Sequence, residues 1–162
     1  MKKKKASILS IVFCIIWIGV IITIFIFSNQ TVEKSYKVSS SVVNEFNQEV
    51  NHYIEWDSWR EIRAFIFVHA RKFAHIFLYS MLAVTCAGFF IAKKKIKRKY
   101  AYIITLIING LYAALDEVHQ IFVPGRGASI LDVGRDCIGV LIGICFCEII
   151  LRIVRRTRRK EP

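Results

Sequence analysis

Residues 8–27 read ILSIVFCIIWIGVIITIFIF, an apolar run without a single charged side chain. A helix of about 20 residues is about 30 Å long, which matches the hydrocarbon thickness of a bilayer. Lys2–Lys5 precede the run, and no small-residue cleavage site follows it. We therefore interpret it as an uncleaved transmembrane helix that enters from the cytosol, rather than as a signal peptide.

Three further apolar segments are predicted, at residues 64–92, 100–122 and 129–153. The chain of 162 residues is 55% hydrophobic, and its mean hydropathy of +0.45 is too high for an ordinary soluble domain. We expect an all-α fold, an integral membrane four-helix bundle, as a single domain over residues 1–162. A short outer amphipathic helix is expected between the first two spans, because apolar residues recur there at near-helical spacing, at Val38, Val42, Val43, Phe46, Val50 and Ile54.

Positive charge is concentrated in three short segments, Lys2–Lys5, Lys93–Lys99 and Arg152–Lys160, which hold sixteen of the 24 basic residues. If successive spans cross the membrane in alternating directions, all three segments lie on the same side of it. The net charge of that side is then +14, and the net charge of the other side is −2. This positive-inside pattern predicts a multi-pass membrane protein with both termini in the cytosol. It also indicates membrane lipids rather than nucleic acid as partners, because no basic face with base-reading groups is visible.

Polar and ionisable residues enter the last three spans near their outer ends. On the second span, Lys72, His75 and Tyr79 share one helical face, with Arg71 beside it. The third span carries a polar stripe, with Glu117 beside it, that consists of Asn109, Tyr112, Asp116, His119 and Gln120. On the fourth span, Asp132 and Asp136 lie one helical turn apart. Charges at membrane depth are costly unless they pair or meet water, so we expect these groups to converge on a small outward-open cavity.

The link between the third and fourth spans has the composition of a tight turn. Pro124 and Gly125 suit the central positions of a type II turn, which can hold Arg126 over the acidic cluster. Ser129 followed by Asp132 resembles a capping box at the start of the fourth helix. Gly139 and Gly143 follow at a spacing that permits close helix packing.

Each of these features also has a simpler structural interpretation. Asp132 alone can cap a helix, Arg71 and Lys72 can reach lipid phosphates, and His75 can be a satisfied bundle residue. Glu148 has Arg152 at i+4, and the five cysteines show no zinc-type spacing, so we interpret them as packing residues. The whole cluster is harder to explain structurally, and we favour a functional role for it.

These residues resemble the VanZ-like family of bacterial membrane proteins over about residues 8–150. The matching pieces are Phe27-Ser28-Asn29-Gln30, Arg71-Lys72-x-Ala74-His75-x-x-x-Tyr79, Asp116-Glu117-x-His119-Gln120-x-Phe122-x-Pro124-Gly125-Arg126 and Asp132-Val133-x-x-Asp136. The third piece is long and specific. Asp136 departs from the pattern, because the family often has Asn there. The resemblance implies an envelope function connected with low-level resistance to the glycopeptide teicoplanin, but it does not imply a biochemical mechanism.

The first functional hypothesis is a binding protein at the outer leaflet. Its ligand would be an anionic envelope lipid, a cell-wall precursor or a glycopeptide, whose phosphate or carboxylate would contact Arg71, Lys72 and Arg126. The expected binding residues are Arg71, Lys72, His75, Tyr79, Asp116, Glu117, His119, Gln120, Arg126, Asp132 and Asp136.

Two other classes remain open. In an intramembrane enzyme acting on an envelope lipid, His75 or His119 would be the general base, and Asp116 or Glu117 would orient it. Asp and His from three helices could also hold a divalent metal, but no metal-binding motif is present, so we expect no metal and no cofactor. A small transporter is disfavoured, because four helices leave little room for alternating access. The sequence does not indicate an oligomeric state.

Overall fold

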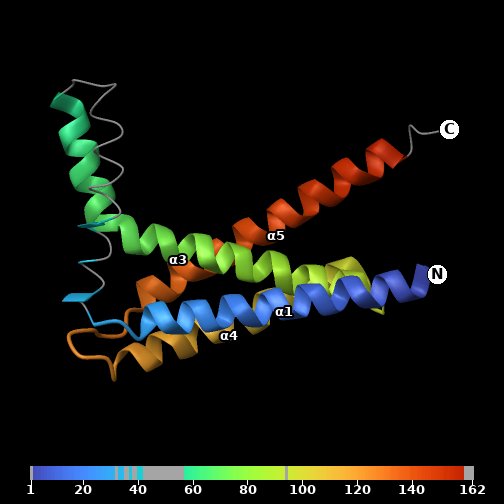
Figure 1. Cartoon of the computed structure of the whole chain (residues 1–162), viewed down its shortest axis with the longest axis horizontal. Coiled ribbons are helices and arrows are strands. Elements are labelled where there is room, and N and C mark those ends of the chain that lie inside the picture. The colour runs from blue at the N-terminus through green and yellow to red at the C-terminus, as the bar shows by residue number, and fades with distance from the viewer. Residues whose placement is uncertain are drawn as a thin grey trace.

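Four long helices make up the described part of this computed structural model: α1 (Lys2–Ser28), α3 (Asp57–Lys93), α4 (Arg98–Gln120) and α5 (Ile130–Arg158) (Figure 1). The structure describes residues 2–31, 33–34, 37, 40–41, 57–93 and 95–158, without the side chains of 2–7, 57–68 and 158. No strand occurs within these ranges, so the all-α fold is confirmed. The expected amphipathic helix over residues 38–54 falls almost entirely outside the described residues.

Each of the four helices contains a segment that is long and apolar enough to cross a membrane. These segments are Ile8–Ser28, His69–Lys93, Arg98–Gln120 and Ile130–Thr157. Many of their large apolar side chains are exposed on the bundle surface, including Ile15, Phe77 and Leu111. Such a surface is stable against acyl chains and unstable in water, so the chain is built as a multi-pass membrane protein.

Helix α3 occupies the centre of the bundle and packs against α1, α4 and α5. Figure 1 shows the start of α1 and the end of α5 toward one side of the molecule and the α4–α5 connection on the opposite side. We call these the basic end, which also holds residues 95–99, and the turn end, which holds Ser28 and residues 121–129. Near the basic end, α5 diverges from the other helices. The alternating thread predicted from the charge pattern is therefore present in the fold.

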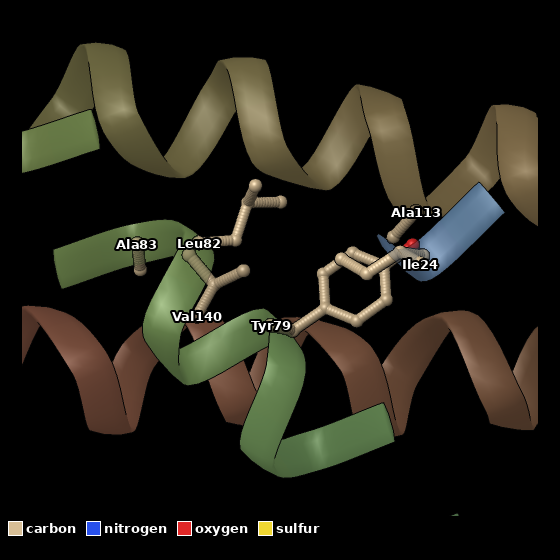
Figure 2. Packing of buried hydrophobic residues seen from close by; sticks show 6 residues of the cluster. All are labelled: Ile24, Tyr79, Leu82, Ala83, Ala113 and Val140. Atoms are coloured by element: carbon tan, nitrogen blue, oxygen red, sulfur yellow. The ribbon is translucent and has the colours of Figure 1, made fainter. Parts of the chain in front are cut away.

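A small apolar core joins all four helices (Figure 2). Helix α3 contributes three buried residues, Tyr79, Leu82 and Ala83, and the other helices contribute one each. These are Ile24 of α1, Ala113 of α4 and Val140 of α5. Lipid tails are as apolar as these side chains, so the hydrophobic effect contributes little to holding membrane helices together. Dispersion contacts at short range must provide much of the attraction, and these require the helices to approach closely.

Two glycines of α5 permit that approach, as their spacing predicted. A Cβ at Gly139 would lie only 2.5 Å from the carbonyl oxygen of Ile76 on α3, and a Cβ at Gly143 would collide with the carbonyl of Ser80. The Ser80 hydroxyl also contacts the Gly139 carbonyl at 2.8 Å, so a hydrogen bond reinforces the crossing. The result is a tight contact between α3 and α5.

At the basic end, Glu148 of α5 gathers three partners. Arg152 donates to it at 2.7 Å, as the i, i+4 spacing predicted. From α4, Arg98 lies 3.0 Å away and the Tyr102 hydroxyl donates at 2.8 Å. This cluster ties α4 to α5 and accounts for the one acidic side chain within the basic half of α5.

Substituting Gly139→Ala should destabilise the bundle by about 1–3 kcal/mol, because the new methyl group meets backbone atoms that cannot rotate away. Gly134→Ala on the same helix is the matched control, since nothing lies within 4 Å of its Cβ position. Thermal unfolding of the detergent-solubilised protein measures both. Equal melting temperatures for the two variants would contradict the proposed close approach.

Candidate functional site

The last turns of α4 bury polar side chains inside the bundle. Asn109, Asp116, Glu117 and Gln120 are all buried, at most 4% exposed, on the face that α4 turns toward its neighbours. Helical spacing explains the pattern, because residues three and four apart lie on one face. A buried carboxylate in a membrane helix requires compensation, so the partners of Asp116 and Glu117 define the site.

Asp116 accepts hydrogen bonds from two other positions. The Ser28 hydroxyl at the end of α1 donates to its Oδ2 at 2.7 Å, and the Gln120 side-chain amide donates to the same oxygen at 3.2 Å. Gln120 in turn accepts a hydrogen bond from the Arg71 guanidinium of α3 at 2.8 Å. One continuous hydrogen-bonded chain therefore joins α1, α4 and α3.

The predicted type II turn is present at the α4–α5 connection. Gly125 has φ 80°, in the left-handed region that glycine tolerates best, and the Arg126 amide donates to the Val123 carbonyl at 3.0 Å. The Arg126 guanidinium donates to the carbonyls of Ser28 at 2.6 Å and Phe27 at 3.3 Å. The turn thus places a cation on the last carbonyls of α1, where the helix dipole favours positive charge.

Burial lowers the pKa of Arg126 to about 10, and the neighbouring charge of Arg71 acts in the same direction. The guanidinium therefore still carries its charge at neutral pH. Two like charges side by side at the turn end favour an anion between them.

Glu117 and Asp132 each have a partner, although the predicted capping box does not form. The Ser129 amide donates to Glu117 Oε2 at 2.9 Å rather than to Asp132, and the carboxylate of Asp132 pairs with Arg135 instead. The helix start at this position is nevertheless correct, because the Ser129 carbonyl accepts the first backbone hydrogen bonds of α5. A glutamate from the preceding helix therefore replaces the local capping carboxylate.

His75 of α3 and Asp136 of α5 face each other across the close contact of their helices. The Nδ1 of His75 lies 3.7 Å from Oδ1 of Asp136, and the two side chains are 11% and 2% exposed. This distance is longer than a hydrogen bond but short enough for strong electrostatic attraction if the imidazole is protonated.

A cavity of about 320 Å³ opens among these groups at the turn end. It contains charges of both signs. Its lining consists of Arg71, Lys72, His75, Glu117, Gln120, Gly125, Arg126, Gly127, Asp132, Arg135 and Asp136. The polar residues of three helices and one turn thus converge, as the sequence predicted.

Three of the expected site residues do not line the cavity. Asp116 reaches it only through Gln120. Tyr79 is fully buried in the apolar core, and its ring stacks at 6.3 Å from that of His75. His119 packs against Phe25 of α1, with ring centroids 5.0 Å apart. Of the two candidate histidines, His75 is therefore the one at the cavity.

Two contributors were missed from the sequence. The sequence singles out Ser28 only as part of the Phe27-Ser28-Asn29-Gln30 piece, yet its hydroxyl compensates the buried Asp116. Arg135 lies three residues after Asp132, a spacing that predicts an ion pair, and it also lines the cavity.

The family comparison matches most of this chain. The pattern of the VanZ/LLP1 family covers residues 11–152, which include every residue of the cavity lining. Comparison with curated proteins and comparison with solved structures each found no match.

Replacing Ser28 by alanine should destabilise the protein by about 1–3 kcal/mol, because Asp116 loses its shortest hydrogen bond inside the bundle. Thr23→Val on the same helix is the control, since the Thr23 hydroxyl donates to the Gly19 carbonyl within α1 and to nothing else in the described part of the chain. Its loss should cost about 0.5 kcal/mol or less. Thermal unfolding compares the two. A Ser28→Ala protein as stable as Thr23→Val would show that this hydrogen bond does not stabilise the junction.

Proposed function

The chain belongs to the VanZ/LLP1 family, and we propose that its cavity binds the phosphate-bearing headgroup of an envelope lipid or of a lipid-linked cell-wall precursor. One observation carries this proposal. Glu117 and Asp132 of the cavity each have a partner within the fold, whereas three of its cations have no carboxylate paired with them among the described residues.

None of these three cations forms an ion pair with a carboxylate of the described residues. Arg71 donates to the neutral Gln120 and Arg126 donates to carbonyls, while Lys72 makes no hydrogen bond or ion pair in the described part of the chain. The buried Nε of Arg126 also has no partner among the described residues. Cations beside a low-dielectric layer are stabilised by an anion, and a phosphate accepts several charge-assisted hydrogen bonds at once. A phosphate group would therefore complete the cavity.

The volume of the cavity limits the ligand. About 320 Å³ lies at the small end of ligand pockets, which suits a phosphate or diphosphate and excludes a whole glycopeptide. Exposed apolar side chains lie next to the cavity residues in the sequence of the same helices, namely Phe73 and Phe77 on α3 and Leu131 on α5. An acyl or polyprenyl tail could lie along these faces while its headgroup enters the cavity.

The proposal includes the orientation of the protein. We place the basic end in the cytosol and the turn end at the outer surface of the bacterial cytoplasmic membrane, with the amphipathic segment of residues 38–54 on the same outer side. The concentration of basic residues at one end of the bundle supports this orientation. A protein that holds a precursor headgroup there would reduce its accessibility to a glycopeptide, which is the contribution to teicoplanin resistance that we propose.

An intramembrane acid–base enzyme is the alternative. The close approach of His75 to Asp136 in the cavity favours it, because a carboxylate can orient an imidazole that transfers a proton. His119 is less suited to this role, since it packs on Phe25 away from the cavity.

The orientation can be tested with an impermeant thiol reagent applied to intact cells. A Gly127→Cys protein should be labelled from outside, whereas Lys95→Cys should react only after the membrane is permeabilised. The five native cysteines all lie within the spans, and the unsubstituted protein measures their background. Labelling of Lys95→Cys but not Gly127→Cys in intact cells would invert the topology and refute an outer-leaflet site.

Headgroup binding can be tested with a polyprenyl diphosphate and the uncharged polyprenol of the same tail. The purified protein should bind the diphosphate more tightly, and Lys72→Gln should weaken that binding about tenfold or more, because a charge-assisted hydrogen bond is lost. Native mass spectrometry or a titration measures both ligands. Lys95→Gln, an exposed basic-end substitution, is the control and should bind normally.

Equal affinity for the two lipids would refute headgroup recognition. In cells, Lys72→Gln should lower the teicoplanin resistance that the unsubstituted protein confers, while Lys95→Gln should retain it. Release of phosphate from the diphosphate probe, lost in His75→Gln, would replace the binding proposal with the enzymatic alternative.

A further inference from the structure

Three buried side chains with metal-binding chemistry meet beside the cavity. They are His75 of α3, Asp116 of α4 and Asp136 of α5, and they are 9%, 4% and 2% exposed. One candidate ligand atom from each lies within 4.8 Å of the other two. Three different helices therefore bring an imidazole and two carboxylates to one point.

This arrangement is electrostatically unfavourable without a further positive charge. Two carboxylates at this distance repel each other strongly in the low dielectric of a membrane bundle. The contact of His75 Nδ1 with Asp136 Oδ1, at 3.7 Å, is too long for a hydrogen bond. It is close to the separation of about 3.4 Å between two ligands of one tetrahedral ion with bonds of about 2.1 Å.

An unpartnered buried oxygen gives independent support. Oδ2 of Asp136 has no hydrogen-bond partner among the described residues, although its side chain is only 2% exposed. The hydroxyl of Tyr79, one helical turn after His75, is also buried without a partner in that part of the chain. A buried acceptor left unpaired costs about 1–3 kcal/mol, and more when it is charged, so the geometry calls for a group that binds this oxygen.

The surroundings of Asp116 resemble the outer shell of a metal site. Ser28 and Gln120 both donate to its Oδ2, which holds the carboxylate in one orientation. Hydrogen bonds of this kind commonly orient carboxylates that ligate a metal with the other oxygen.

We propose that His75, Asp116 and Asp136 bind one divalent transition-metal ion, of the Mn²⁺ or Zn²⁺ class. One nitrogen and two carboxylate oxygens suit these ions better than Mg²⁺ or Ca²⁺, which prefer oxygen ligands alone. Because His75 and Asp136 also line the cavity, the remaining coordination positions of the ion face it. The site goes beyond the headgroup proposal and does not depend on it.

The test uses the purified full-length chain in detergent, stripped with a chelator and titrated with Mn²⁺. Free Mn²⁺ is followed by electron paramagnetic resonance. Mn²⁺ is chosen because it avoids the thiolates of the five free cysteines, which would bind Zn²⁺ nonspecifically. We expect about one ion per chain, and Asp136→Asn and His75→Gln should each weaken binding by about tenfold or more.

The matched controls are His119→Gln and Glu148→Gln, which remove one imidazole and one carboxylate away from the cluster and should leave Mn²⁺ binding unchanged. Helical circular dichroism confirms that each variant is folded. The proposal is overturned if the unsubstituted chain binds no Mn²⁺, or if folded Asp136→Asn and His75→Gln bind it with full affinity. Because no lipid is added, a negative result here leaves the headgroup proposal standing, and failure of headgroup binding leaves the metal site standing.

Discussion

Compensation of the buried carboxylate of Asp116 is the constraint on which the turn end of this bundle depends. A charge within a membrane-spanning helix cannot rely on water, so its partners must come from other helices. Ser28 supplies one hydrogen bond from α1, and Gln120 supplies another that continues to Arg71 of α3. The requirement of one side chain thus determines how three helices meet.

The other charged side chains of the cavity also need partners inside the bundle. Glu117 accepts the amide of Ser129, and Asp132 pairs with Arg135, so both acids are satisfied within the fold. Arg71 and Arg126 bond to neutral acceptors. Two of the acids that line the cavity are therefore satisfied by the fold itself, whereas Arg71 and Arg126 have no paired carboxylate among the described residues, which is the basis for proposing an anionic headgroup as the ligand.

Close packing makes this arrangement possible. His75 can face Asp136 only because α3 and α5 approach at the Gly139 crossing, where a side chain would collide with the Ile76 carbonyl. In a bilayer such contacts replace the hydrophobic effect as the attraction between helices. The glycine spacing of α5 and the polar cluster at its start are therefore parts of one structural unit.

The sequence by itself determined the four spans, the basic end, the type II turn and the convergence of polar residues. These features follow from hydropathy, charge placement and glycine geometry, which depend only on neighbouring residues. Only the tertiary structure decided which side chains meet. It separated His119 from His75, gave the Ser129 amide to Glu117 rather than Asp132, and assigned Ser28 to Asp116. The physical reason is that such pairings depend on how each helix is rotated about its axis and on the angle at which it crosses its neighbours. Contacts between residues that are distant in the sequence determine both.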